Sequence, residues 1–372
     1  MKSIFLNYQP YGTTKQHGAW FYNNFPKNLP QNTMNRYSQM LIVYDEILPN
    51  HVIRKIKALL TPFSKNKETY PFTYGRKSLV ALSKIWKKMV DFVPDVLVGV
   101  GGGTVSDLVG FASGTYQRGI PDILFPTTTL GIVDAALGGK TAIDFHHVKN
   151  SIGIMHYPLA VINILETMKT LPKAEFLSGF SEAVKGAVLF DKDYFEMLEN
   201  NIQDILTFNN SNKLCGIIAH AAKLKMLNAE LPSEHKIKLL YGHAIGHAIE
   251  MSSNNRFRHG DAVSIGITIE GAIAYLLKYW KINEWRRQTT LLLNLSLPIK
   301  FPNSLNVDNL FNRMSLYKKL VNNGAYGFIF PSNIGSVVKH HEGYVTYVPI
   351  HQVKKLVNQA ITFINNESFL IR

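Results

Sequence analysis

The feature that most constrains the fold is an unbroken apolar segment that runs directly into three glycines. Residues 95–100 read DVLVGV, and Gly101, Gly102 and Gly103 follow before a helical pattern at 106–116. A continuous apolar run suits a strand that is buried on both faces. Glycines after such a strand let the backbone approach a phosphate, which the N–H groups of the following helix bind. The segment therefore predicts an α/β protein with a nucleotide phosphate at this turn or, because the GxGxxG pattern is absent, a tight turn without a ligand.

The hydrophobic pattern changes character at about residue 173. In the first half, strand patterns at 40–44 and 123–125 alternate with helical patterns at 51–60 and 77–92, which is typical of a parallel, doubly wound sheet. In the second half the spacing is helical, over residues 174–189, 192–208, 212–227, 237–252 and 261–280. We therefore expect an α/β plus α protein, with a Rossmann-like domain over residues 1–173 and a mainly helical domain over residues 174–372.

The composition excludes several classes of protein. The chain has 372 residues, enough for two domains, and its single cysteine, Cys215, excludes a disulfide framework and a cysteine-rich zinc site. No apolar stretch is long enough to span a bilayer and no signal peptide is apparent, so we expect a soluble, cytoplasmic protein. The 40 Lys and Arg outnumber the 26 Asp and Glu by 14, but they are scattered along the chain. Scattered charge favours a solvated surface, or attraction of an anionic small substrate, over nucleic-acid binding.

A histidine pair forms the sharpest local pattern. His243 and His247 are four residues apart, so they share one face of a helix, and His259 follows where the next helix begins. Both histidines of the pair could bind one metal, or one could be a ligand while the other acts on the substrate; partly buried structural histidines are the alternative. No Glu follows His243, which excludes the zinc-protease HExxH pattern. Glu182 offers a carboxylate, which is costly to bury unless it is paired or bound to a metal.

Small residues and cations are interleaved in a second segment, residues 138–150. It contains Lys140, Lys149 and Asn150 beside glycines. With Arg118 and Asp134, these residues form a plausible set of ligands for a phosphate and for hydroxyl groups. A single lysine of this kind is more often a surface charge, so only the set as a whole favours a binding site.

Taken together, these segments resemble 3-dehydroquinate synthase and the wider sugar-phosphate cyclase family. The matching motifs occur in family order over roughly residues 45–319, and they are GGGTVSDLVGF, TYQRG, PTTTL, VDAALGGKTAID, VKNSIG, MKTLP, SGFSEAVKG, GHAIGHAIE and HGDAV. The resemblance implies that residues 1–173 bind NAD and that residues 174–372 bind a metal and the substrate.

Carried over residue by residue, the resemblance implies a complete site. The ligands of a divalent metal, zinc or cobalt, would be Glu182, His243 and His259. The catalytic residues, with a proton-handling histidine at the substrate phosphate, would be His247, Lys140, Lys185, Lys225 and Asp134. Further substrate ligands, the first of them from the neighbouring subunit of a homodimer, would be Arg118, Asn150, Lys236 and Lys319. The NAD contacts would be Asp45, Lys77, Gly102, Gly103, Thr104, Asp107, Thr127, Thr128, Lys149 and Ser178.

Three positions depart from the family pattern. Tyr74 stands where a ribose-binding Glu is usual, and Leu240 stands where an Asn precedes the first histidine. Lys236 aligns with an Arg that grips a substrate carboxylate, and a point-charge Lys is not equivalent to a bidentate Arg. The substrate is therefore less constrained than the reaction.

The implied reaction converts a sugar phosphate to a carbocycle with loss of phosphate and depends on NAD and a metal. The leading expectation is 3-dehydroquinate synthase activity on 3-deoxy-arabino-heptulosonate 7-phosphate, a step of the shikimate pathway of aromatic amino acid biosynthesis. A sister cyclase of the 2-epi-5-epi-valiolone or 2-deoxy-scyllo-inosose synthase type is the first alternative. A metal-dependent alcohol dehydrogenase and a non-enzymatic, polyanion-binding relative are the others.

Overall fold

The chain divides into two compact units. The first comprises Met1–Phe176 and Asn210–Glu230, and the second comprises Leu177–Asn209 and Leu231–Arg372. The computed structural model describes residues 3–30, 34–73, 75–146, 148–208, 211–253, 256–314 and 320–367.

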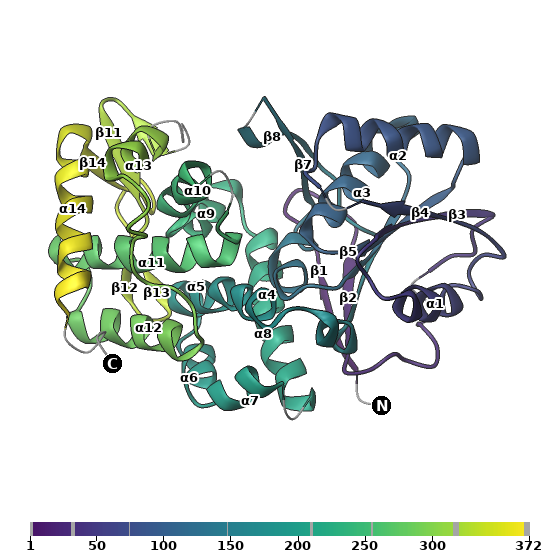
Figure 1. Ribbon diagram of the computed structural model, residues 1–372, viewed down its shortest axis with the longest axis horizontal. Coiled ribbons are helices and arrows are strands. Elements are labelled where there is room, and N and C mark those ends of the chain that lie inside the picture. Colours follow the sequence, from purple (N-terminus) through teal and green to yellow (C-terminus); the bar gives the residue numbers. More distant parts are fainter. Residues whose placement is uncertain are drawn as a thin grey trace. The chain divides into compact units, whose positions relative to one another are not determined.

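A seven-stranded sheet forms the centre of the first unit in the described part of the chain (Figure 1). Neighbouring strands are parallel, except for the antiparallel edge pair β1 and β2. Across the sheet the order is β1 (Ser3–Tyr8), β2 (His17–Tyr22), β9 (Ala160–Ile164), β6 (Asp122–Pro126), β5 (Val96–Gly101), β3 (Gln39–Asp45) and β4 (Asn66–Phe72). Strands β5, β6 and β9 are buried along their whole length, as expected of parallel strands covered on both faces.

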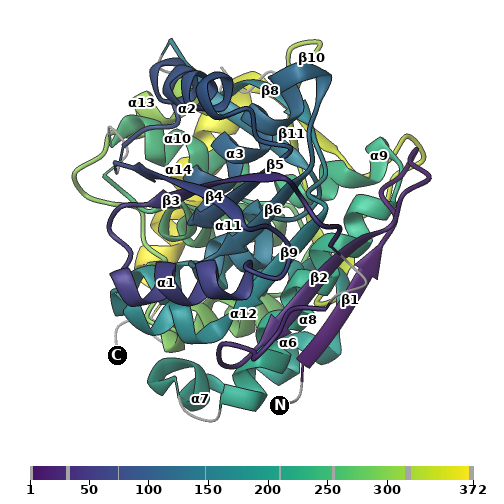
Figure 2. The same cartoon turned by 90° about the vertical axis from the view of Figure 1, so that its right-hand side faces the viewer.

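Helices cover both faces of this sheet, which confirms the doubly wound α/β expectation. Helix α1 (Asn50–Leu59) packs its apolar side, including Val52 and Ile56, against alternate residues of β3, β5 and β6. Helices α2 (Leu79–Phe92) and α3 (Gly103–Thr115) lie on the opposite face (Figures 1 and 2). Gly99 permits close packing of α3 on the sheet, because a Cβ there would be in tight contact with Leu124 Cδ2, at 3.0 Å, and with Val109 Cγ2, at 3.1 Å.

Two features of the first unit differ from the sequence expectation, although the helical pattern over residues 212–227 was itself expected. The first is a hairpin of β7 (Lys140–Phe145) and β8 (Val148–Met155), which forms a separate two-stranded sheet. The second is helix α8 (Ser211–Glu230), which a division at residue 173 assigns to the second domain. In the last turn of α8, Ala229 O accepts a hydrogen bond from Tyr11 N at 3.1 Å. This bond fixes the loop that follows β1.

The second unit is mainly helical, as expected. Its main helices are α5 (Phe180–Phe190), α6 (Lys192–Glu199), α7 (Ile202–Thr207), α10 (His243–Ser252), α11 (His259–Leu276), α12 (Ile282–Asn294), α13 (Val307–Met314) and α14 (Ile350–Asn366). None of the helices in the described ranges is long and apolar enough to cross a bilayer. Small unexpected sheets join them, from strands β10 (Val321–Asn322), β11 (Ala325–Phe328), β14 (Thr346–Pro349), β12 (Pro331–Asn333) and β13 (Ser336–Val337).

Three helices expected to be continuous are interrupted. The expected helix over residues 192–208 divides at Asn200 and Asn201 into α6 and α7. The expected helix over residues 174–189 divides at Gly179 into α4 (Lys173–Ser178) and α5. The expected helix over residues 237–252 divides at Gly242 into a 3₁₀ turn, Ile237–Leu240, and α10. Gly242 has a left-handed φ of 72°, which ends the first segment and starts the second.

Candidate active site

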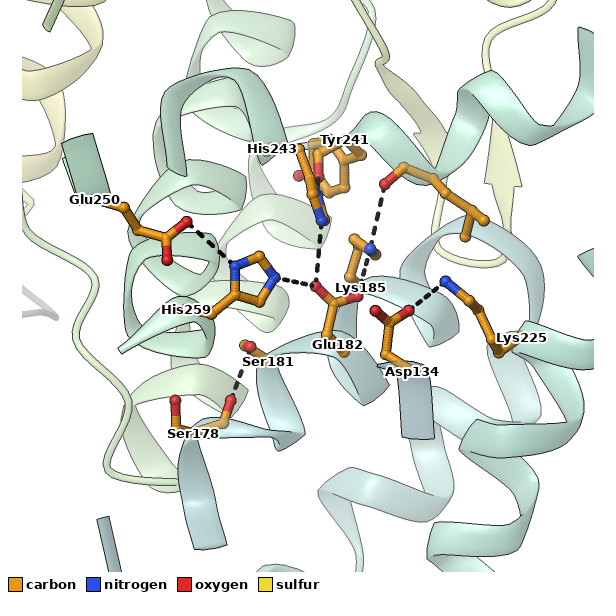
Figure 3. A network of polar contacts seen from close by, with 12 residues as sticks. Asp134, Ser178, Ser181, Glu182, Lys185, Lys225, Tyr241, His243, Glu250 and His259 are labelled. Carbon is orange, nitrogen blue, oxygen red and sulfur yellow. Dashed lines mark hydrogen bonds and ion pairs between the residues drawn. The ribbon is translucent and has the colours of Figure 1, made fainter. Parts of the chain in front are cut away.

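Three helices of the second unit carry the residues expected to bind a metal (Figure 3). Glu182 lies on α5, His243 and His247 lie one turn apart on α10, and His259 is the first residue of α11. Helices α10 and α11 cross closely at Gly242, where a Cβ would lie 2.3 Å from Ile267 Cγ2. The crossing fixes the backbone at the start of α10, directly before His243.

The side chains converge with the spacing of a metal site. Glu182 Oε1 lies 3.4 Å from His243 Nε2 and 3.5 Å from His259 Nε2. His243, His247 and His259 each offer a ring nitrogen within 4.8 Å of the others. Glu182 Oε1 is buried and has no hydrogen-bond partner among the described residues. A buried, unsatisfied carboxylate oxygen among imidazole nitrogens fits a divalent metal such as zinc, which takes His and carboxylate ligands.

The outer nitrogens of two imidazoles have different partners. His259 Nδ1 lies 3.3 Å from Glu250 Oε2, whereas His243 Nδ1 lies 3.3 Å from the backbone oxygen of Tyr241. Partners of this kind orient metal-binding histidines and leave the other nitrogen free to coordinate. Glu250 was not predicted; it is three residues after His247 in GHAIGHAIE, so it shares the helix face, and this spacing was the available clue.

Buried charges set the protonation of the cluster. Lys185 Nζ forms an ion pair with Glu182 Oε2 and donates to Leu239 O at 3.2 Å. Burial would raise the pKa of Glu182, but Lys185 and His243 hold that pKa well below its usual range. Burial, aided by Lys185, holds the pKa of His243 well below its usual range, so this imidazole is neutral, as a metal ligand must be. The pKa of His259 is raised to about 10, because Glu182 and Glu250 outweigh its burial.

Two lysines of the first unit pair with carboxylates. Lys225 on α8 pairs with Asp134, in the short π-helix Gly131–Ala135 (Figure 3). Lys77 contacts both Asp107 Oδ2 and Asn150 Oδ1. Burial raises the pKa of Asp107 to about 6, although Lys77 opposes the shift. The structure thus brings Asn150, expected to bind phosphate, together with two residues expected to bind NAD.

The glycine turn lies where the carboxyl ends of β3, β5 and β6 meet. A Cβ on Gly102 would lie 3.1 Å from Thr128 Cγ2, and one on Gly101 would lie 3.2 Å from Asp45 Cβ. Thr127 N donates to Gly101 O at 2.9 Å, which ties the ends of β5 and β6 together. Helix α3 begins at Gly103, three residues before the expected start, so its first N–H groups are at this edge. Such an edge is where dinucleotides bind in doubly wound folds.

The remaining predicted residues are distributed over both units. In the first unit, Lys140 opens β7, Lys149 lies in β8, Thr104 lies in the first turn of α3, and the exposed Arg118 ends a 3₁₀ turn. In the second unit, Ser178 ends α4, and its carbonyl oxygen accepts a bond from Ser181 Oγ at 2.9 Å. Lys236 ends the short helix α9 (Ser233–Lys236), and Leu240 ends the 3₁₀ turn that follows. Lys319 and Tyr74 lie outside the described residues.

The first unit is doubly wound and has a glycine turn at its strand ends. The second unit is helical and brings a glutamate and three imidazoles together. This combination is that of a dehydroquinate synthase-like class of protein. Two sequence profiles match the chain. The 3-dehydroquinate synthase N-terminal profile matches residues 73–178, and the 3-dehydroquinate synthase C-terminal profile matches residues 179–320. The 3-dehydroquinate synthase of Coxiella burnetii (strain Dugway 5J108-111) is 36% identical over 291 residues, which cover 76% of this chain and 81% of that protein. The chain belongs to the 3-dehydroquinate synthase family, which confirms the resemblance.

Solved structures agree on the fold. A 2-deoxy-scyllo-inosose synthase complexed with carbaglucose-6-phosphate, NAD+ and Co2+ superimposes with a TM-score of 0.83 at 20% identity, covering 95% of this chain and 100% of that one. The 2-epi-5-epi-valiolone synthase ValA from Streptomyces hygroscopicus subsp. jinggangensis 5008, with NAD+ and Zn2+ bound, gives 0.77 at 21% identity, covering 92% and 96%. At these identities the likeness concerns the fold alone.

Proposed function

We propose that this chain is an NAD- and metal-dependent cyclase that converts a phosphorylated seven-carbon keto acid to a carbocycle with loss of phosphate, as 3-dehydroquinate synthases do. The observation that supports it most is the cluster in which Glu182 Oε1 lies within 3.5 Å of two imidazole nitrogens. A lone structural glutamate at this burial would be satisfied by hydrogen bonds instead.

The residues present fit both cofactors. Glu182, His243 and His259 would hold the metal, either zinc or cobalt, and the turn at Gly102 and Gly103 would hold the pyrophosphate of NAD. When bound, NAD would take up and return a hydride and the metal would polarise a carbonyl oxygen. The unsatisfied Glu182 Oε1 and the glycines between the end of β5 and the first turn of α3 are the observations that support these assignments.

The other side chains would bind the substrate and move protons. Lys140 and Arg118 supply positive charge for the phosphate. His247 is on the same helix face as His243, with ring centroids 5.3 Å apart, and from there would protonate the departing phosphate. Lys185, Lys225 and Asp134 would contact substrate hydroxyl groups, and the ion pairs of the two lysines orient them.

Two residues favour a second candidate, a sister cyclase that acts on a neutral sugar phosphate. Leu240 presents an apolar side chain where the family has an Asn, and Lys236 replaces the bidentate Arg. The 36% identity to a 3-dehydroquinate synthase favours the keto acid. A metal-dependent alcohol dehydrogenase is less favoured, because the lysines of residues 138–150 serve a phosphate that such an enzyme does not need.

The test is turnover on a panel of substrates. The protein, with NAD and zinc, is incubated with 3-deoxy-arabino-heptulosonate 7-phosphate, sedoheptulose 7-phosphate and glucose 6-phosphate, and both phosphate release and the cyclic product are measured. We expect the highest kcat/KM with the keto acid and no net formation of NADH. Preference for sedoheptulose 7-phosphate would select the second candidate, and net NADH formation would select a dehydrogenase.

We also propose a homodimer in the cytoplasm. Arg118 is exposed, so its guanidinium is accessible to a neighbouring copy. The hairpin β7–β8 exposes Val148, Ile152 and Met155 by 55%, 41% and 52%, and apolar side chains of this kind are common at interfaces. Light scattering with wild type and Ile152→Asp tests the dimer, which the added charge should dissociate.

A further inference from the structure

A buried acidic residue of the first unit has no role in the site described so far. Asp122 begins β6 and is fully buried, and its Oδ1 lies 3.0 Å from His156 Nε2. Tyr8 and His17, from the two strands at the sheet edge, contribute to the same electrostatic neighbourhood. A buried carboxylate is costly unless it is paired, so the pair with His156 stabilises the position of that residue.

This cluster contacts the backbone of the turn Gly138–Gly139 from two sides. Tyr8 Oη accepts a hydrogen bond from Gly138 N at 3.3 Å, and Gly139 O accepts one from His156 N at 2.8 Å. Both residues have a left-handed φ, 79° and 71°, which favours glycine. Because both are glycines, the turn has no side chains that could hold its conformation. The ring of Tyr157 closes the space above it, since a Cβ on Gly139 would lie 2.4 Å from Tyr157 Cδ1.

Lys140 is the next residue after this turn. It opens β7 and pairs in register with Met155, the residue directly before His156. Its backbone position is therefore set on one side by the turn and on the other by the strand that the Asp122–His156 pair holds. The N-terminal profile match begins at residue 73, so it does not include Tyr8.

We propose that Tyr8 and the Asp122–His156 pair are positioning residues that place Lys140 for the substrate phosphate. The proposal rests on the proposed function, in which Lys140 is a phosphate ligand. A lysine that holds a leaving phosphate must be placed accurately, because a misplacement of about 1 Å can cost as much as 10²-fold in rate. A turn made of two glycines cannot provide that accuracy without outside contacts.

A double-mutant cycle tests whether these residues act through Lys140. Tyr8→Phe, Asp122→Asn and Lys140→Ala are made singly, and the first two are then combined with Lys140→Ala. For each protein we measure KM and kcat from phosphate release, the Kd for NAD and the thermal midpoint. Ser64→Ala is the control, because it also removes a buried hydroxyl that bonds to the backbone of the same unit; Ser64 Oγ donates to Asn66 O at 2.9 Å.

We expect each of Tyr8→Phe and Asp122→Asn to raise KM by roughly tenfold and to leave the Kd for NAD unchanged. In the protein that already carries Lys140→Ala, the same substitutions should have no further effect on KM. Ser64→Ala should leave KM unchanged. A lowered thermal midpoint with wild-type KM, or equal KM effects with and without Lys140, would overturn the proposal.

If Asp122→Asn does not fold, Tyr8→Phe, which removes one hydroxyl, decides alone. If Lys140→Ala itself leaves KM unchanged, the phosphate role in the proposed function is wrong, which is a distinct result.

Discussion

Two ion pairs, one from each unit of this protein, differ in their exposure to solvent. In the first unit, the ion pair of Lys77 and Asp107 has side chains 16% and 15% exposed, and polar groups cluster at strand ends beside glycines. In the second unit, Lys185 and Glu182 form an ion pair inside the helices, with side chains only 3% and 4% exposed. The first pair is partly open to solvent, whereas the second pair is enclosed, so its two charges must compensate one another.

This difference predicts how each unit responds to substitution. Removing one partner from a buried charge network leaves the other partner uncompensated, at a cost of about 3–5 kcal/mol. A glycine turn depends instead on the absence of side chains, so added atoms rather than lost ones should damage it. Substitutions in the buried charge cluster of the second unit should therefore have larger effects than substitutions at the glycine turn of the first.

The largest effect is expected from loss of a metal ligand. His243→Ala should remove the metal and bring turnover below detection, a greater loss than the roughly 100-fold that outer partners of ligands cost. Metal content and phosphate release are the measurements, and His351→Ala, an exposed histidine on α14, is the control. Wild-type metal content in both His243→Ala and His259→Ala would show that the metal site lies elsewhere.

The next effect concerns Glu250. Glu250→Ala removes the partner of His259 Nδ1 and should weaken zinc binding by about 10–100-fold. Glu250→Gln keeps an oxygen acceptor and should lose less. Competition with a chelator measures the affinity, and Glu199→Gln, which breaks the pair with Arg287 in the same unit, is the control. Equal zinc affinity in the Ala and Gln variants would contradict an orienting role.

In the first unit, the corresponding test adds atoms. Gly102→Val places a branched side chain against Thr128 and in the path of the pyrophosphate. NAD binding should weaken by at least roughly tenfold, about 1.4 kcal/mol. Gly216→Ala is the control, because nothing lies within 4 Å of a Cβ there. Equal NAD affinity by calorimetry in wild type and Gly102→Val would remove the turn from the NAD site.

A smaller effect is expected at Lys236. If the substrate has a carboxylate, Lys236→Ala should raise KM by a few-fold and Lys236→Arg should preserve or improve it, because Arg offers a bidentate contact. For a neutral sugar phosphate neither change should matter. Steady-state kinetics with both substrate types separates the two cases, and Leu240→Asn, which restores the family residue, should help only if a hydroxyl or phosphate lies beside it.

The smallest effect is a change in pH dependence. Glu270 on α11 accepts bonds from Gly242 N at 2.7 Å and Ile329 N at 2.9 Å, and burial raises its pKa from 4.5 to about 8. Between these values the folded protein keeps a proton that the unfolded chain releases, so this group makes stability fall as pH rises through that window. Glu270→Gln should flatten the dependence of unfolding free energy on pH by at most about 1.4 kcal/mol per unit. Denaturant unfolding measures it, and parallel profiles for the two proteins would refute the prediction.

Much of the first unit follows from local pattern. The strand β5, the turn and helix α3 were predicted within three residues, because an apolar run, glycines and a change to helical spacing are adjacent in sequence. The cluster of His243 and His247 was equally accessible, since a four-residue spacing fixes a shared helix face whatever the helix packs against. The roles of these residues stay predictions, because their proximity does not establish a ligand.

What the sequence alone determined is thus the α/β-plus-helical order, while the residues of the site stay predictions from the sequence. Only the tertiary structure decided which unit includes α8 and that Asn150 contacts Lys77. It also decided that Glu250 is the partner of His259 and that Tyr8 contacts the turn before Lys140. The last of these pairs is 130 residues apart. Periodicity reports the face that a residue occupies on its own helix or strand, but the partner across that face depends on how distant segments pack, and no local pattern encodes it.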